Sequence, residues 1–319
     1  MLEIRLVVTI KPMKDMIAHS KFVVLFLASR PKFLVASAAP VLVGSAAGYA
    51  VAGTFQPVLF ILALLSIMLL HCGANITNDY YDHISGNDWV NKNPTPFSGG
   101  RRFIQEGILS AKATFLAALF CFAVGSAVGL VILYLTRSVF ILTLGLIGIL
   151  GGFFYTARPI QLGYRCFGEL VIAMLFGLLP VFGSYCLQTN SVDSIILLPA
   201  FIVSILIFLV ILANEFPDFP ADAQVAKRTL VVSFGVPTCV WIYRSALVIS
   251  YILAATMLIY RVTFLSGVFY LLTVPLAVLA IKLANENDLS KPGLYRANQI
   301  TILLHMIGSL SLAAGFLIG

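Results

Sequence analysis

Charged residues are scarce in this sequence of 319 residues. Only 10% of the residues are Asp, Glu, Lys or Arg, whereas 60% are hydrophobic. A soluble protein of this length needs far more polar surface than these residues supply. The shortage of charge therefore excludes a soluble globular protein. It indicates an all-α polytopic membrane protein, because long apolar runs cross a bilayer as helices.

Several common site motifs are also missing. The five cysteines form no CxxC pair, and the four histidines show no metal-ligand spacing. The sequence contains no Walker phosphate loop, no GxSxG nucleophile motif and no dinucleotide-binding fingerprint. The sequence thus gives no support to a zinc site, a thiol centre or a nucleotide-binding loop, and the cysteines are expected to be small apolar packing residues.

Apolar runs long enough to cross about 30 Å of hydrocarbon occur along most of the chain. The sequence predicts nine membrane-spanning helices, at about residues 34–54, 57–75, 113–135, 138–156, 167–188, 194–213, 243–260, 262–283 and 299–318. A bundle with one or two fewer spans and re-entrant segments is the alternative. Residues 1–33 carry scattered basic residues and no signal-peptide cleavage site, which predicts a cytoplasmic, interfacial segment. A single transmembrane domain is then expected over residues 34–319.

The positions of the basic residues predict the orientation, because basic loops stay on the cytoplasmic side. With the N-terminus inside, eighteen of the twenty Lys and Arg residues lie in the cytoplasm, and only Arg137 and Arg261 lie outside. The net charge of +7 then reflects membrane orientation and anionic ligands, and nucleic acid is not an expected partner. The sequence predicts a multi-pass protein of the cell membrane, the inner or plasma membrane, with its N-terminus in the cytoplasm.

Acidic residues are rarer still, and six of the thirteen fall in two short stretches. NDYYDHISGND follows the second predicted span, and NEFPDFPAD follows the sixth. Both stretches have the order Asn, acid, Asp, Asp, and they begin 136 residues apart. This repeated pattern predicts two related halves that face one site. The catalytic cytoplasmic loops are expected at about residues 76–112 and 214–242.

Side chains three and four positions apart share one face of a helix, so each stretch can present carboxylates and amides together. Two facing carboxylate clusters repel one another unless a cation lies between them, and Mg²⁺ binds through a few carboxylates together with substrate phosphates. Pro217 and Pro220 remove helix N–H donors, so the second cluster is expected to lie in an irregular turn. The candidate metal ligands are Asn75, Asp79, Asp82, Asp88, Asn214, Asp218 and Asp222.

Basic residues follow each acidic stretch. Lys92, Arg101 and Arg102 come after the first, and Lys227 and Arg228 come after the second. Acidic and then basic side chains in one loop are expected where metal ions and cationic groups share a polyphosphate. The alternative is an ordinary solvated loop whose basic residues only fix the orientation.

Longer motifs carry a resemblance to a known family. NDYYDHISGND and NEFPDFPADAQVAKRTL resemble the two aspartate-rich motifs of the UbiA family of intramembrane prenyltransferases. SRPKFLVASAAPVLVG at the first span and YTARPIQLGYRCFGEL between the fourth and fifth extend the resemblance over nearly the whole chain. The NDYYDxxxGxD spacing, the YT…P…LGY segment and the KRTL ending are most similar to the branch that prenylates 1,4-dihydroxy-2-naphthoate in menaquinone synthesis.

The resemblance implies a UbiA-type helix bundle and an Mg²⁺-dependent prenyl transfer on the cytoplasmic side of the membrane. Mg²⁺ would bind the diphosphate of a polyprenyl diphosphate, and the allylic cation would be attacked by an aromatic acceptor, with loss of carbon dioxide if that acceptor is dihydroxynaphthoate. The implied catalytic residues are Asp79, Asp82, Asp218, Asp222 and Tyr155. The implied substrate-binding residues are Asn75, Asn78, Arg101, Arg102, Arg158, Lys227, Arg228 and Asn214.

Other acceptors and one other class of protein stay open. Within the enzyme family, 4-hydroxybenzoate, another aromatic ring or a glycerol-phosphate lipid could accept the prenyl group. Intramembrane acids in a repeated bundle could also mark an ion-coupled transporter. A transporter would place its acids near the bilayer midplane, whereas these six are expected at one end of the helices.

Overall fold

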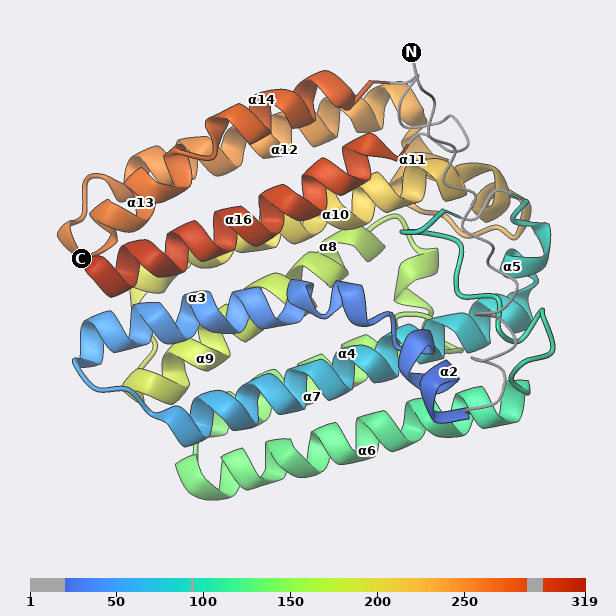
Figure 1. Ribbon diagram of the computed structural model, residues 1–319, viewed down its shortest axis with the longest axis horizontal. Coiled ribbons are helices and arrows are strands. Elements are labelled where there is room, and N and C mark those ends of the chain that lie inside the picture. The colour runs from blue at the N-terminus through green and yellow to red at the C-terminus, as the bar shows by residue number, and fades with distance from the viewer. Residues whose placement is uncertain (1–20, 93–94, 286–294) are drawn as a thin grey trace, which may run out of the picture.

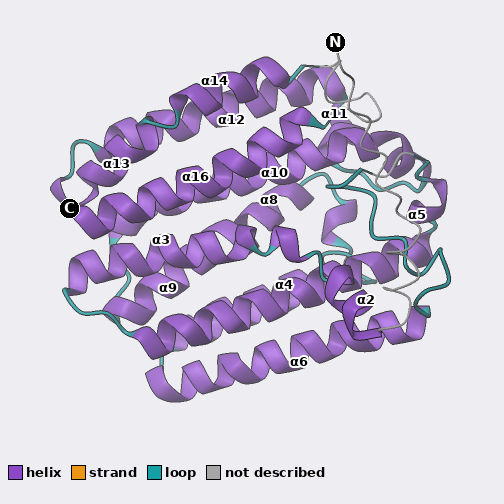
Figure 2. Cartoon of the chain, viewed as in Figure 1, coloured by secondary structure: helices purple, strands orange, loops and turns teal. Residues whose placement is uncertain are grey.

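The computed structural model describes residues 21–92, 95–285 and 295–319, which form a bundle of helices lying roughly side by side (Figure 1). Figure 2 shows helices and loops in these ranges and no strand. The predicted all-α class is therefore confirmed. Residues 1–20 of the expected interfacial segment lie outside the described residues, and the role of that segment stays a prediction.

The first half of the chain, up to residue 164, carries the first aspartate motif. Its elements are α2 (Lys21–Ala28), η1 (Pro31–Phe33), α3 (Val35–Ala52), α4 (Pro57–Ser85), α5 (Asn87–Val90), α6 (Ala111–Thr136), α7 (Val139–Phe154) and η2 (Leu162–Tyr164). The first aspartate motif lies on the last turns of α4 and on α5.

The second half carries the second aspartate motif at the end of α10. Its elements are α8 (Gly168–Ala173), η3 (Met174–Leu178), α9 (Leu179–Thr189), η4 (Ser194–Ile196), α10 (Leu197–Gln224), α11 (Leu230–Phe234), α12 (Val236–Met257), η5 (Arg261–Thr263), α13 (Phe264–Leu271), α14 (Val274–Leu283) and α16 (Arg296–Ile318). The segment η3 is a single π-helical turn that joins α8 to α9.

Seven of the described helical segments are long and apolar enough to cross a membrane. A bent pair, Arg261–Leu271 and Val274–Leu283, makes an eighth span if its two parts cross together at their 50° angle. The helix α7, predicted as a span over 138–156, has 16 residues and is shorter than the other spans. The chain is thus a multi-pass membrane protein, and the count of nine spans stays a prediction.

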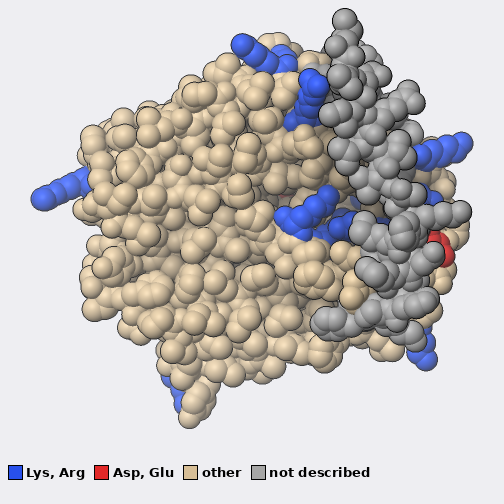
Figure 3. Space-filling model, viewed as in Figure 1, with Lys and Arg blue, Asp and Glu red and all other residues tan. Residues whose placement is uncertain are grey.

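Both aspartate motifs lie at the same end of the bundle. In Figure 1 this end carries α2, α5 and α11, whereas the C-terminus lies at the opposite end. Most of the Lys and Arg side chains visible in Figure 3 gather toward the end with the motifs, and the helix surfaces between the two ends are largely uncharged. Basic side chains therefore gather at the end that carries both motifs, and the cytoplasmic location of that end stays a prediction.

Small residues allow the helices to approach closely, as is common in membrane bundles. An added Cβ at Gly44 of α3 would come within 2.1 Å of Ser184 Oγ on α9, and one at Gly48 would come within 2.5 Å of Gln188 Cβ. On the other side of the bundle, a Cβ at Gly73 of α4 would meet the ring of Phe122 on α6 at 2.8 Å. These contacts fix α3 against α9 and α4 against α6, and so they position the end of α4.

The helix α10 continues through both prolines, so the expected irregular turn is wrong. Pro217 has no N–H to donate to the carbonyl of Ala213 four residues earlier. The Asn298 side chain of α16 replaces that donor: its Nδ2 donates to Ala213 O at 3.0 Å and to Asn214 Oδ1 at 2.9 Å. A side chain from a neighbouring helix therefore satisfies the carbonyl that Pro217 leaves without its helical donor.

Replacing Asn298 by Ala is expected to destabilise the fold by about 1–3 kcal/mol, because it leaves a buried carbonyl without a partner. Thermal unfolding in detergent measures this effect. The exposed neighbour Gln299 gives the control variant Gln299→Ala. In a Pro217→Ala background the helix regains its own N–H donor, so the cost of Asn298→Ala should shrink; an equal cost in both backgrounds would contradict this explanation.

Candidate functional site

The first motif presents its carboxylates from two elements that meet at a glycine. The helix α4 ends at Gly86, whose φ of 84° lies in the left-handed region, where glycine has no steric penalty. This turn redirects the chain so that the short helix α5 buries Asn87 and Asp88 beside Asp82. Asp82 and Asp88, which are six positions apart in the sequence, therefore lie together in the folded chain.

The buried Asp88 carboxylate is held by the loop that follows it. Gln105 Nε2 donates to Asp88 Oδ2 at 3.0 Å, and a Cβ at Gly100 would come within 2.9 Å of Asp88 Oδ1. Burial, together with the nearby carboxylates of Asp82 and Asp79, raises the pKa of Asp88 to about 8. Burial among other acids therefore disfavours the charged form of Asp88, and a bound cation would offset that cost.

The second motif lies directly opposite the first, and amide side chains join the two. Asn87 Nδ2 donates to Asp222 Oδ1 at 2.7 Å, and Asn91 Nδ2 donates to Asp218 Oδ1 at 3.0 Å. The backbone N–H of Gly99 donates to the other oxygen of Asp218 at 3.2 Å. The predicted meeting of two distant acidic stretches is therefore present in the structure.

Lys227 places a positive charge between the two motifs. Its Nζ lies 3.5 Å from Asp222 Oδ1 and 3.9 Å from Asp82 Oδ2. Burial acts to lower the pKa of Lys227, but the carboxylates of Asp222 and Asp82 outweigh burial and raise the pKa well above its usual value. The ammonium group thus stays charged and reduces the repulsion between the facing carboxylates.

Asp79 has a different partner. Its carboxylate forms an ion pair with the guanidinium of Arg30, which lies between α2 and η1. Burial opposes the charged form of Arg30, but the carboxylates of Asp79, Asp88 and Asp82, with Asp79 contributing most, together raise the Arg30 pKa. Asp82 instead accepts from Asn78 Nδ2 at 2.6 Å and lies 3.3 Å from the Tyr164 hydroxyl.

A polar cavity of about 90 Å³, here called the acid cavity, lies among these groups, but Asp79, a predicted metal ligand, does not line it. Its walls include acids from both motifs and the bases that face them: Asp82, Asp88, Glu215, Asp218, Asp222, Arg30 and Lys227. The buried Asp222 Oδ2 and Glu215 Oε2 accept no hydrogen bond from the described residues. Buried carboxylate oxygens without a donor are the atoms that a cation satisfies.

The donor set suits a hard cation such as Mg²⁺, because it consists of carboxylate and amide oxygens. Among the described residues, no three Asp, Glu, His or Cys side chains converge closely enough to hold an ion as they stand. Lys227 and Arg30 lie among the carboxylates and occupy part of their bonding capacity. The residues therefore fit a cation that shares its carboxylates with these two bases and takes its remaining ligands from phosphate or water.

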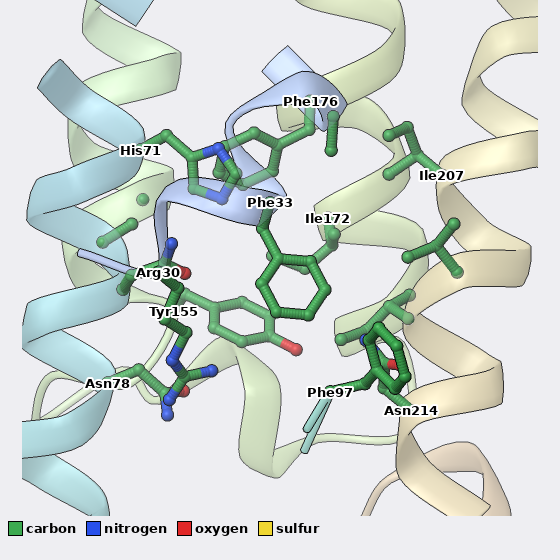
Figure 4. A pocket seen from close by; sticks show the side chains of 16 residues that line it. Arg30, Phe33, His71, Asn78, Phe97, Tyr155, Ile172, Phe176, Ile207 and Asn214 are labelled. Carbon is green, nitrogen blue, oxygen red and sulfur yellow. The ribbon is translucent and has the colours of Figure 1, made fainter. Parts of the chain in front are cut away.

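A second, more apolar cavity of about 140 Å³ adjoins the acid cavity, and it is here called the apolar chamber. Both cavities are lined by Arg30, Asn78, Phe97, Tyr155, Ile211 and Asn214. Figure 4 shows Arg30, Asn78 and Asn214 toward one end of the chamber, and His71 and Phe176 toward the other. The Tyr155 ring lies between the polar and apolar ends, with its hydroxyl toward the interior.

Several predicted binding residues do not line the acid cavity. Asn75 lines only the apolar chamber and donates to Ser29 O at 3.0 Å. Arg102 donates to the backbone carbonyls of Asp88 and Asn91, at 3.1 and 2.9 Å, and so it holds the loop in place. Arg101 is half-buried, and its charge acts on Arg30 and Asp79.

Arg158 and Arg228 are exposed and line a separate polar cavity of about 630 Å³ on the other side of Tyr164. They lie on the loops before η2 and before α11, and no ion pair within the described residues involves either side chain. The structure thus separates these two arginines from the carboxylates with which the sequence groups them.

Other residues of the site were missed by sequence reasoning. Arg30, Asn87 and Asn91 are absent from the residues that the sequence motifs single out, yet each binds an acid of the site. Asn91 follows Asp88 by three positions, a spacing that places both on one helix face, whereas Asn87 follows Asp82 by five positions and gives no such signal. Nothing local in the sequence links Arg30 to Asp79, 49 residues away.

Residues 37–291 match the UbiA prenyltransferase family. The chain belongs to this family. The 1,4-dihydroxy-2-naphthoate octaprenyltransferase of Haemophilus influenzae is 31% identical over 302 residues, which cover 90% of this chain and 94% of that protein. The 2-carboxy-1,4-naphthoquinone phytyltransferase of Synechocystis is 24% identical and covers 91% of each chain. The chain is therefore an integral membrane enzyme that transfers prenyl groups.

The fold of this UbiA family member is also found in solved structures. A UbiA homolog from Archaeoglobus fulgidus bound to GPP and Mg²⁺ has a TM-score of 0.70 and 19% identity, and the match covers 92% of this chain and 98% of that one. A UbiA homolog from Archaeoglobus fulgidus bound to DMAPP and Mg²⁺ has a TM-score of 0.68 and 18% identity. At this identity the likeness supports the shared helical fold.

Proposed function

We propose that the protein transfers a polyprenyl group from polyprenyl diphosphate to 1,4-dihydroxy-2-naphthoate, with loss of carbon dioxide, in menaquinone biosynthesis. One observation carries the proposal: acids from two motifs 136 residues apart line one polar cavity, and that cavity adjoins an apolar chamber. A diphosphate and its prenyl chain need such a pair of environments side by side. The naphthoate relatives support the choice of acceptor.

The acid cavity is the proposed diphosphate site. Asp82, Asp88, Asp218 and Asp222 would hold Mg²⁺, with Asn78 and Asn214 at the edge toward the chamber. Bound Mg²⁺ would neutralise the charge that develops on the departing pyrophosphate. Lys227 and Arg30 add fixed positive charge in the same place, and Arg101 adds to it from the loop, so the leaving group is stabilised by groups that need no rearrangement.

The apolar chamber is the proposed place of carbon–carbon bond formation. The allylic C–O bond breaks at the boundary of the two cavities, where the Tyr155 ring can face the carbocation with its π electrons. Phe33 and Phe97 are in edge contact, with centroids 6.3 Å apart. Together with the rest of the chamber they exclude water, which would otherwise capture the cation.

The loop that carries Phe97 would cover the reacting groups, because Phe97 lines both cavities. Lys32 Nζ lies 4.4 Å from the centre of the Phe97 ring and donates to the carbonyl of Pro96. These contacts fix the loop over the chamber through cation–π attraction and a hydrogen bond.

The donor and acceptor would reach the site from the cytoplasmic end, and the product would remain in the membrane lipid.

The test is transfer by purified protein in detergent or lipid, with one polyprenyl diphosphate and a panel of acceptors. We expect dihydroxynaphthoate to yield a prenylated product by mass spectrometry, with equal release of pyrophosphate and carbon dioxide, and only when Mg²⁺ is present. Preferred use of 4-hydroxybenzoate or a glycerol-phosphate lipid would contradict the acceptor. Transport of an ion without any product would contradict the reaction itself.

A further inference from the structure

One polar side chain at the apolar end of the chamber has no role in the proposed reaction. His71 of α4 lines the apolar chamber and is 7% exposed. The chamber wall near it includes the apolar side chains of Ala36, Ile172 and Phe176. A polar ring buried among apolar groups costs free energy unless its nitrogens find partners. The partners of the two ring nitrogens therefore decide what His71 can do.

One nitrogen of the His71 ring has a protein partner. Its Nδ1 lies 2.7 Å from Ser37 Oγ on α3. Ser37 is fully buried, and its hydroxyl makes no other hydrogen bond within the described residues. A buried hydroxyl proton needs an acceptor, so the Ser37 O–H donates and Nδ1 accepts. The proton of the neutral imidazole then lies on the other nitrogen, Nε2.

The Nε2–H group of His71 faces the chamber without a partner. No hydrogen bond from residues 21–92, 95–285 or 295–319 reaches it. Unlike Nε2 of the buried His305, it is not sealed off by packed side chains. Figure 4 shows the His71 ring reaching from α4 into the chamber, beside Phe176. A buried N–H donor that faces an open cavity needs an acceptor atom, and a bound molecule can supply one.

Contacts on both sides hold the imidazole in this orientation. The Phe176 ring lies with its centre 4.5 Å from that of His71, at an angle of 51°. Phe176 belongs to the π-helical turn η3, and such turns are frequent at functional sites. The backbone of η3 is packed closely, because a Cβ at Gly177 would come within 2.5 Å of Ser204 Cα on α10. With Ser37 on the other side, the N–H donor is fixed before a ligand arrives.

The surroundings indicate which atom the donor would bind. A prenyl chain is a hydrocarbon and contains no hydrogen-bond acceptor, so the partner belongs to the aromatic acceptor. Among the residues that line the chamber, Arg30 is the only Lys or Arg, and it lies toward the opposite end from His71 (Figure 4). A carboxylate would therefore point toward Arg30, and an uncharged hydroxyl oxygen would suit His71. In 1,4-dihydroxy-2-naphthoate the 4-hydroxyl is the hydroxyl farther from the carboxylate.

We propose that His71 Nε2–H donates a hydrogen bond to the 4-hydroxyl oxygen of the acceptor and so selects aromatic acids that carry a hydroxyl at that position. Ser37 is a positioning residue, because it keeps the ring proton on Nε2. The inference rests on the proposed function for the identity of the acceptor. This placement leaves the carboxylate side of the ring toward the acid cavity, where the carbocation forms and carbon dioxide is lost.

The experiment measures the binding of two aromatic acids by isothermal titration calorimetry on the purified protein in detergent. 1-Hydroxy-2-naphthoate lacks only the 4-hydroxyl of 1,4-dihydroxy-2-naphthoate. The unchanged protein should bind the dihydroxy acid at least about tenfold more tightly, because the other acid leaves a buried donor unpaired. In His71→Phe this preference should fall to about twofold or less, since no donor remains to recognise the hydroxyl.

Three further variants separate recognition from structure. His71→Gln can donate from nearly the same place as Nε2 and should retain part of the preference. Ser37→Ala lets the ring proton occupy either nitrogen, so its preference should lie between those of the unchanged protein and His71→Phe. His305→Phe is the matched control. His305 is 1% exposed and contacts Ser309, but it does not line the chamber, so its loss should leave the preference unchanged.

Each outcome decides the inference. An undiminished preference in His71→Phe would overturn it, and so would an equal loss of affinity for both acids, which a purely structural role predicts. Equal affinity of the unchanged protein for both acids would also overturn it, and binding of neither would overturn the choice of acceptor as well. A preference that depends on His71, in a protein that transfers no prenyl group, would instead refute the proposed function alone.

Discussion

Asp222→Asn is expected to lower the rate of prenyl transfer by at least about a hundredfold, the scale of effect at metal-binding positions. Asp222 Oδ1 is shared by Asn87 and Lys227, and its Oδ2 has no donor among the described residues. The variant keeps the shape of the side chain and removes its charge. Asp82→Asn, in the other motif, should have an effect of the same size. Steady-state rates at several Mg²⁺ concentrations measure both.

The control for these variants is Asp193→Asn. Asp193 lies on the exposed connection between α9 and η4, where it accepts hydrogen bonds from Tyr185 and Ser191. It is an acid outside the candidate site, so its loss should change the rate by less than about twofold. If Asp222→Asn retained the full rate, the acid cavity would not be the diphosphate site.

Lys227→Gln should have two separable effects. Without Mg²⁺ the variant should unfold at a lower temperature than the unchanged protein, because removing one partner of a buried ion pair costs about 3–5 kcal/mol. Mg²⁺ binds only the folded carboxylate cluster, and it should raise the midpoint of the variant more than that of the unchanged protein because the Lys227 ammonium no longer competes for Asp82 and Asp222. Thermal unfolding with Mg²⁺ and with a chelator measures this difference.

The rate of the same variant should fall by about a hundredfold even with saturating Mg²⁺, because the departing pyrophosphate loses a fixed positive charge. Lys282→Gln, at an exposed residue near the end of α14, provides the matched control for loss of one lysine. Full activity together with unchanged stability in Lys227→Gln would contradict the placement of this ammonium between the motifs.

The part of the site that could be predicted from the sequence depends on short-range helix geometry. Asp218 and Asp222 lie four positions apart, so their shared face follows from the helical repeat. Their meeting with Asp82 could be predicted because the acidic pattern recurs and because charge asymmetry places both stretches at one side of the membrane. The amide bridges through Asn87 and Asn91 also lie within the motif region, although only the structure shows their partners.

The remaining features depend on contacts between distant segments. The apolar run of the second span ends near residue 75, but α4 continues to Ser85, because its polar face packs against other polar groups and needs no lipid. Pro217 indicated a break in the second motif, and Asn298 of α16, 81 positions later in the sequence, removes the need for one. Helix propensity and hydropathy contain no information about such partners. The helix ends and the Arg30–Asp79 ion pair could therefore not be predicted from the sequence.

In the proposed mechanism the two aspartate motifs form a single site for a divalent cation and a diphosphate. Electron paramagnetic resonance can follow the binding of Mn²⁺, in place of Mg²⁺, with pyrophosphate added in place of the donor. The unchanged protein should bind Mn²⁺ more tightly when pyrophosphate is present, and Asp82→Asn and Asp222→Asn should each abolish that gain. If either variant kept the full pyrophosphate-dependent binding, the two motifs would not share one site.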